Sequence, residues 1–172
     1  SVDELADRAY EAFGAVHLLC NNAGVMTVGP IAESTPEDWQ FIFGVNVFGV
    51  VHGIQAFVPR MQAQGGEAHI VNTASIGGFI SGNALYSATK FGVVALTESL
   101  NAELARGNSK VKVSLLCPGY VKTRLADSAR NRPAELPDAS PQNRATAVLR
   151  QRFAEAVAAG IEASVVAEHV LS

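Results

Sequence analysis

Three short apolar runs alternate along this chain with segments of helical periodicity. The runs are Val16–Asn21, His69–Thr73 and Val111–Cys117. A short run without polar alternation is typical of a strand buried on both faces, as in parallel sheets, and the first run is expected to be such a strand. The order strand, helix, strand, helix, strand predicts right-handed crossovers and a parallel α/β sheet with helices on its faces.

Five segments are predicted to be helices: Val2–Phe13, Pro36 to about Gln64, Ala84–Ala105, Arg144–Ala159 and Ser164–Leu171. Thr35 is expected to cap the second helix, because a threonine hydroxyl can accept a free N–H of the first turn. Pro59 should kink this helix or end its regular part, since proline has no N–H to donate. The polar, proline-containing segment 124–143 is predicted to be a mobile loop on the substrate side.

Composition narrows the class of protein. The chain has 172 residues, of which 48% are hydrophobic and 17% charged, as expected of one globular domain. A net charge of −3 argues against a nucleic-acid binder. No apolar run approaches the roughly 20 residues that span a bilayer, and no leader peptide is seen. The two cysteines are expected to be free buried thiols in the cytoplasm, and the four histidines show no metal-ligand spacing.

Polar residues and glycines follow each predicted strand. These segments are Asn21–Gly24, Asn72–Ser75 and Cys117–Tyr120. The carboxyl ends of parallel strands meet at one edge of a sheet, where ligands bind. Tyr86 and Lys90 begin the helix after the middle strand, so they should face the same edge.

Tyr86 and Lys90 lie four residues apart, which makes them neighbours on a helix, about 5–6 Å apart at Cβ. A positive charge beside a phenol lowers its pKa, so that the phenol can exchange a proton with a substrate oxygen. The same spacing also arises where a lysine merely extends along a helix face toward water.

Together these segments resemble the short-chain dehydrogenase/reductase family. The matching motifs are Asn21–Gly24, Gly44–Val47, Ile70–Ser75, Tyr86–Lys90 and Pro118–Thr123. The resemblance implies a Rossmann-like oxidoreductase that interconverts secondary alcohols and carbonyls with NAD or NADP. It also implies a small alcohol or ketone substrate and a homodimer or homotetramer.

The resemblance implies a role for each site residue. Tyr86 would be the general acid or base, and Lys90 would lower its pKa and bind the nicotinamide ribose. Ser75 would hold the substrate oxygen, although Thr73 or Ser81 could compete for this role. Asn46 would support a water that links Lys90 to solvent. Cofactor contacts would come from Asn22, Ala23, Gly24, Tyr86, Lys90, Pro118, Gly119, Val121 and Thr123. By position, the substrate pocket would be lined by Gly77, Phe79, Ile80, Leu85 and Tyr120.

A glycine-rich turn for the cofactor pyrophosphate is not found in the chain. Gly44, Gly49 and Gly53 lie along a predicted helix, where they are expected to permit close packing. Residues 1–172 are therefore interpreted as one incomplete domain, the C-terminal portion of the fold, without the first βαβ unit and the last strand. The run Val16–Asn21 would then expose a hydrophobic edge, and the isolated chain should bind nicotinamide cofactor poorly. The alternative is a non-catalytic fragment that retains only the helices of subunit association.

Overall fold

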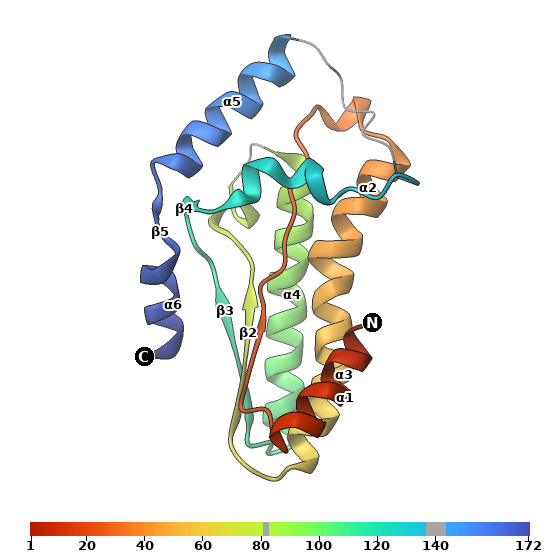
Figure 1. The fold of residues 1–172 in the computed structure, drawn as a ribbon, viewed down its shortest axis with the longest axis vertical. Helices are drawn as coiled ribbons and strands as arrows, with labels where there is room; N and C mark the ends of the chain where they lie inside the picture. The colour runs from red at the N-terminus through yellow and green to blue at the C-terminus, as the bar shows by residue number, and fades with distance from the viewer. Residues whose placement is uncertain (81–82, 137–143) are drawn as a thin grey trace.

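The three predicted strands form one parallel sheet. The structure is a computed structural model that describes residues 1–80, 83–136 and 144–172. Strands β1 (Leu18–Asn21), β2 (Ala68–Thr73) and β3 (Val111–Leu116) pair in the order β1-β2-β3. The register sets Asn21 opposite Asn72 and Asn72 opposite Leu115, so the carboxyl ends of the strands meet at one edge, as predicted. Figure 1 shows α1, α3 and α4 on one side of the strands and α6 on the other.

Strand β1 is the edge of this sheet within the described residues, as expected. The prediction that it is buried on both faces is wrong, because Leu18 and Cys20 are exposed. β1 pairs only with β2, and α3 packs against it from one side. The Cys20 thiol is therefore free but not buried.

Helix α1 (Val2–Phe13) agrees with the predicted bounds. Ser1 and Glu4 form a capping box at its start, and Gly14 ends it with φ of 74° in the left-handed region that glycine adopts readily. Ala6 is completely buried in the core against α3, while Phe13 is 81% exposed.

The second predicted helix is one helical run with three parts. It comprises α2 (Pro36–Phe43), a π-helical turn over Gly44–Phe48, and α3 (Gly49–Ala63). Thr35 caps it as predicted, with its hydroxyl accepting from Asp38 N at 3.3 Å. Pro59 does not end the helix, which continues to Ala63. The departure from regular α geometry instead falls at the π turn, which the sequence did not predict.

Close packing explains only one of the three glycines in this run. A Cβ on Gly53 would lie 2.1 Å from Oδ1 of Asn21, so α3 approaches β1 only because this residue is glycine. A Cβ on Gly44 would meet nothing within 4 Å. Asn21 then donates to Oδ1 of Asn72 at 2.8 Å, and Asn72 donates to Oγ1 of Thr97 at 3.0 Å. These side chains connect α3, β1 and β2 to α4 beneath the functional edge.

The run Pro36–Ala63 is long and apolar enough to cross a membrane by length and composition, contrary to the sequence prediction. Ala56, Phe57 and Met61 of α3 are buried in the protein core with Ile70 of β2 and Val111 of β3. This packing accounts for the apolar side chains on the inner side of α3, while less than half of the most apolar stretch of the run is buried.

Helix α4 comprises Ala84–Arg106 and carries both Tyr86 and Lys90. Asn83 caps it by accepting from Tyr86 N at 3.4 Å. Val93, Leu100 and Leu104 are buried against the sheet and α3. Burying side chains of this size stabilises the fold by about 1.5–3 kcal/mol each, which holds Tyr86 and Lys90 on a rigid element.

The predicted loop 124–143 contains local helical turns. Residues Arg124–Asn131, together labelled η4, form two short 3-10 helices that meet at a kink at Asp127. The hydroxyl of Thr123 accepts from Leu125 N at 3.3 Å, and the hydroxyl of Ser128 accepts from Met26 N at 2.9 Å. Arg132 then forms a buried ion pair with Asp38 of α2 at 2.7 Å. These contacts fix residues 124–132 on the loop after β1 and on α2; residues 137–143 of the predicted loop lie outside the described residues, as does Ser81.

A small second sheet was missed by the sequence prediction. Strands β4 (Val121–Lys122) and β5 (Ile161–Glu162) pair in parallel. Their pairing brings together the two ends of the segment 123–160. Between them lies α5 (Arg144–Ala158), and α6 (Ala163–Leu171) follows, close to the predicted bounds of both helices. A Cβ on Gly160 would lie 2.4 Å from the carbonyl oxygen of Tyr120, so this pairing requires glycine.

Candidate active site

A cavity of about 730 Å³ opens at the carboxyl ends of the strands. Nine of the predicted site residues line it: Asn22, Gly24, Ser75, Tyr86, Lys90, Pro118, Gly119, Val121 and Thr123. Ala23 and Asn46 do not line it. Ala23 is exposed beside the cavity, whereas Asn46 is buried beneath it. The structure thus brings together segments that are up to about 100 residues apart in the sequence, as the parallel-sheet argument predicted.

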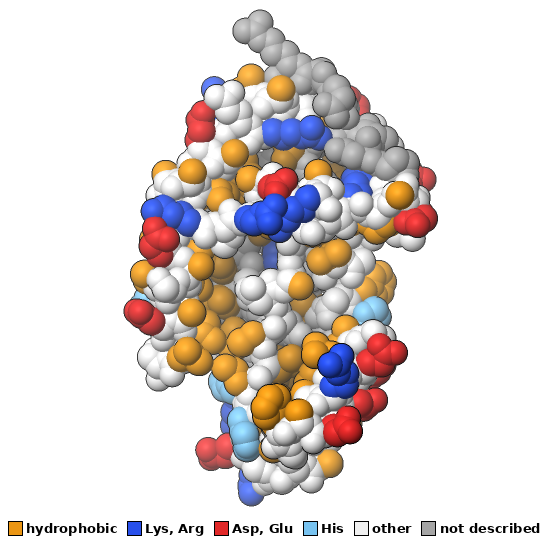
Figure 2. Space-filling view, viewed as in Figure 1, with side chains coloured by type: hydrophobic (Ala, Val, Ile, Leu, Met, Phe, Trp, Pro, Cys, Tyr) orange, Lys and Arg blue, Asp and Glu red, His pale blue; other side chains and the backbone are white. Residues whose placement is uncertain are grey.

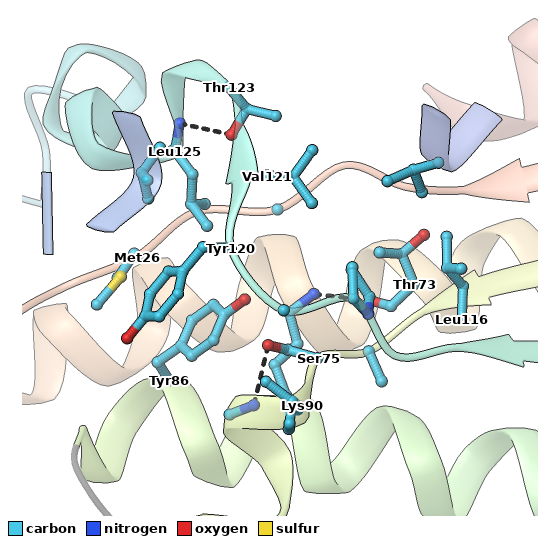
Figure 3. A pocket seen from close by; sticks show the side chains of 18 of the residues that line it. Met26, Thr73, Ser75, Tyr86, Lys90, Leu116, Tyr120, Val121, Thr123 and Leu125 are labelled. Atoms are coloured by element: carbon cyan, nitrogen blue, oxygen red, sulfur yellow. Dashed lines mark hydrogen bonds between the residues drawn. The ribbon is translucent and has the colours of Figure 1, made fainter. Parts of the chain in front are cut away.

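Tyr86 stands in the first turns of α4 and is 9% exposed. Figure 3 shows its hydroxyl directed toward Ser75. Burial raises the pKa of Tyr86 above its ordinary value, and the nearby Ser75 hydroxyl opposes this rise. The expectation that Lys90 lowers the pKa is therefore wrong for this chain. Lys90 Nζ lies over the Tyr86 ring, 5.7 Å from its centre.

Lys90 is 3% exposed, and its amine donates to the carbonyl oxygen of Thr73 at 2.8 Å. Burial lowers the pKa of Lys90 to about 8, and the nearby Cys117 works in the opposite direction. An amine with such a pKa can hold or release a proton close to neutral pH. Cys117 itself is exposed, not buried as predicted, because it lies just beyond the end of β3.

Ser75 caps the short 3-10 helix η3 (Ile76–Gly78), and its hydroxyl accepts from Gly77 N at 3.0 Å. A Cβ on Gly77 would lie 3.3 Å both from the Ser75 hydroxyl oxygen and from Cε1 of Tyr86, so glycine lets the loop pass close to both. The hydroxyl of Thr73 donates instead to Oδ1 of Asn22 at 3.2 Å. Of the two described candidates, Ser75 is the one beside Tyr86.

Asn46 lies in the π turn and is 1% exposed. Its Oδ1 accepts from Val25 N at 2.8 Å, and its Nδ2 donates to Val25 O at 2.9 Å and to Oγ1 of Thr89 at 3.0 Å. Thr89 Oγ1 donates in turn to the carbonyl oxygen of Tyr86 at 2.8 Å. These bonds use both Nδ2 hydrogens and one lone pair of Oδ1, and they tie the loop after β1 to the helix turn that carries Tyr86.

Thr89 is a positioning residue that the sequence analysis missed. Its side chain is completely buried, and its hydroxyl accepts the third of the hydrogen bonds made by the Asn46 side chain. A threonine immediately before Lys90, on the same helix turn as Tyr86, is the signal that could have indicated it, since a buried hydroxyl needs a partner.

The predicted substrate pocket is only partly correct. Gly77, Ile80 and Tyr120 line the cavity, whereas Phe79 and Leu85 do not. Leu85 is buried in the core with Phe41 and Ile42 of α2. The exposed ring of Phe79 meets the edge of Phe91, with 6.4 Å between ring centres. The missed lining residues come from α5, α6, η4 and the loop after β1, including Met26, Leu125, Leu149, Arg152, Phe153 and Val166.

Comparison with known proteins assigns the chain to a family. Residues 1–134 match the model for short chain dehydrogenase, and the chain therefore belongs to the short-chain dehydrogenase/reductase family. It is similar to the CLA biosynthesis dehydrogenase/reductase of Lactiplantibacillus plantarum, with 37% identity over 161 residues, 91% of this chain and 56% of that protein. It is also similar to the 3-alpha-(or 20-beta)-hydroxysteroid dehydrogenase of Mycobacterium tuberculosis, with 42% identity over 70% of this chain and 46% of that protein.

A solved structure agrees closely in shape. The short-chain dehydrogenase/reductase from Burkholderia phymatum, crystallised in complex with NAD, superimposes with a TM-score of 0.89 at 46% identity. That match covers 92% of this chain and 57% of the other. The chain thus spans about half the length of the relatives it matches.

Proposed function

We propose that the full-length protein is an NAD- or NADP-dependent oxidoreductase that interconverts a secondary alcohol and a carbonyl. The observation that carries the proposal is the meeting of Tyr86, Ser75 and Lys90 in one cavity wall. The relatives add support, because they are named as dehydrogenases and one solved neighbour is bound to NAD and another to NADP. The substrate would be a small alcohol or ketone, and we expect a cytoplasmic enzyme.

The lining residues fit a nicotinamide cofactor at the strand ends. Asn22 and Gly24 would hold its adenosine side, and Pro118, Gly119, Val121 and Thr123 its nicotinamide side. A Cβ on Gly119 would meet nothing within 4 Å, so the space there is open. The bound cofactor would supply or accept the hydride.

The proton chemistry follows from the chain's own residues. A phenol whose pKa is raised stays protonated at neutral pH, so Tyr86 is prepared to donate its proton to a carbonyl oxygen during reduction. The Ser75 hydroxyl would donate a hydrogen bond to the same oxygen and stabilise the charge that develops there. Lys90 would return a proton to Tyr86 from its own amine. Both Nδ2 hydrogens of Asn46 are already donated, so a water that links Lys90 to solvent would bind the second lone pair of Asn46 Oδ1 or the backbone beside it.

The test is turnover by the full-length protein. Absorbance at the nicotinamide band would be followed with each reduced cofactor and a panel of neutral and charged ketones. We expect ketone-dependent oxidation of NADH or NADPH. Residues 1–172 alone, as the matched sample, should bind the cofactor poorly by isothermal titration. Absence of turnover with every ketone and both cofactors would contradict the proposal.

The second candidate function is subunit association without catalysis. Phe48 at the end of the π turn is 53% exposed and Phe91 on α4 is 58% exposed, so the two long helices present apolar side chains outward. A full-length protein that forms a stable dimer or tetramer but turns over no substrate would favour this alternative.

A further inference from the structure

The charges that line the cavity all have one sign. Its described lining contains two cations, Lys90 and Arg152, and neither aspartate nor glutamate. Lys90 is almost fully buried and already donates to Thr73 O. Arg152 is exposed and makes no hydrogen bond or ion pair with any other described residue. Its guanidinium is therefore available to a ligand.

Arg152 lies on the side of α5 that faces the cavity. Leu149, Arg152, Phe153 and Val157 line the cavity at spacings of three, one and four residues, which is one face of an α-helix. The Phe153 ring packs near Tyr120, with 6.2 Å between ring centres. Gln151 and Glu155 do not line the cavity and bond to each other at 2.8 Å. Arg152 is therefore the one charged residue among the described residues of α5 that line the cavity, which are otherwise apolar.

Two carboxylates of η4 and β5 are paired with other basic side chains. Asp127 pairs with Arg124 at 2.8 Å and with Arg130 at 3.5 Å, and Glu162 pairs with Lys122 at 2.5 Å. Figure 2 shows Lys and Arg side chains gathered over β4 and η4, above hydrophobic side chains that gather over α6 and the adjoining strands. Basic groups beside an apolar hollow favour a ligand that has an apolar body and an anionic end.

We infer that Arg152 binds a carboxylate of the substrate, so that the enzyme acts on apolar hydroxy acids and oxo acids. This inference rests on the proposed oxidoreductase function. A guanidinium binds a carboxylate through two parallel hydrogen bonds, which fixes the orientation of the substrate as well as its affinity. Leu149, Phe153 and Val166 would cover the apolar body and exclude water from that pair. Tyr86 would then meet the hydroxyl or oxo group away from the carboxylate.

The experiment compares each acid with its neutral ester in the full-length enzyme. The probes are 4-hydroxypentanoate, 6-hydroxyheptanoate and 8-hydroxynonanoate, which place a secondary alcohol at increasing distance from the carboxylate, and the methyl ester of each. The variants are Arg152→Gln and Arg152→Lys, with Arg106→Gln as the matched control. Arg106 is an exposed arginine in the last turn of α4 and does not line the cavity.

We expect the wild type to prefer at least one acid over its ester. Arg152→Gln should lower kcat/KM for that acid about tenfold, chiefly through KM, because a charge-assisted hydrogen bond is lost. It should leave the ester and the cofactor KM unchanged, and Arg152→Lys should restore part of the preference. Arg106→Gln should behave as the wild type.

Two results would overturn the inference without affecting the proposed function. One is equal loss of activity with acid and ester in Arg152→Gln. The other is a change confined to the cofactor KM, which would assign Arg152 to a cofactor phosphate. Turnover of the methyl esters by the wild type tests the oxidoreductase function separately.

Discussion

The two walls of the cavity are built in different ways. The strand-end wall, consisting of Ser75, Tyr86 and Lys90, is buried and connected by hydrogen bonds to Thr73, Thr89 and Asn46. The helical wall, consisting of the cavity-lining residues of α5 and α6, includes the largely exposed Leu149 and Leu171. Buried hydrogen bonds fix the position of a side chain to a fraction of an ångström, whereas exposed apolar surface constrains position only loosely. Proton transfer needs side chains that are held by buried hydrogen bonds. Substrate binding can be achieved with apolar side chains that are held less tightly.

The largest expected effect separates two tyrosines that line the same cavity. Tyr86→Phe in the full-length enzyme should lower kcat by about 10²–10⁴-fold, because it removes the proton donor beside Ser75. Tyr120→Phe is the matched change on the other side of the cavity, where the ring is 55% exposed and packs on Phe153. It should alter kcat little. Steady-state kinetics compares the kcat values of the two variants, and circular dichroism checks that both are folded. Equal losses of kcat in the two variants would mean that the two walls do not differ in their role.

A smaller effect concerns the burial of Lys90. Its folded pKa of about 8 lies below its ordinary value of 10.5, so between these pH values the unfolded chain keeps a proton that the folded chain has lost. The free energy of unfolding of the wild type, relative to Lys90→Met, should therefore rise between about pH 8 and 10.5, by at most about 3 kcal/mol. Urea unfolding at several pH values measures this difference.

Lys110→Met serves as the control for this pH series. Lys110 is exposed and donates to the carbonyl oxygen of Gly65, away from the cavity. Its variant should show no comparable rise. A Lys90 difference that stays flat or falls with pH would mean that this lysine keeps its charge in the folded protein.

The smallest expected effect lies in the helical wall. Gly160→Ala would place a Cβ 2.4 Å from the Tyr120 carbonyl oxygen and disturb the bond from Ile161 N to that oxygen, 3.1 Å long. Such crowding costs about 1–3 kcal/mol, and here it should loosen α5 and α6 rather than the whole fold. Hydrogen exchange should accelerate roughly tenfold or more over residues 146–171 and stay unchanged over β2 and α4.

Gly66→Ala is a matched control for this exchange experiment, because its Cβ would come only within 3.8 Å of His17. Uniform acceleration across the chain in Gly160→Ala would show that the helical wall is not an independent unit.

The sequence predicted the parts of this molecule whose neighbours are local or follow from the parallel sheet. The cap at Thr35 depends only on residues within one helical turn, and the carboxyl ends of parallel strands must lie at one edge of the sheet. The π turn was not predictable, because it is stabilised by a distant partner: Asn46 bonds to Val25 and Thr89. The pKa of Tyr86 was predicted in the wrong direction, because a spacing of four residues gives proximity but not burial. The helices α5 and α6 were predicted, but their place in the cavity lining was not. That place depends on the pairing of β4 with β5, two strands of two residues each that lie about 40 residues apart in the sequence.

The pairing of β4 with β5 has a consequence for the segment that lies between the two strands. Residues 123–160 leave and rejoin the body of the protein at adjacent points, where Val121 faces Ile161 and Lys122 faces Glu162. A segment whose two ends are held side by side can change in length and sequence without moving its anchors. A change of sequence within this segment that keeps the two anchors would alter the part of the cavity lining that η4 and α5 supply, while Tyr86 and Lys90 on α4 stay in place.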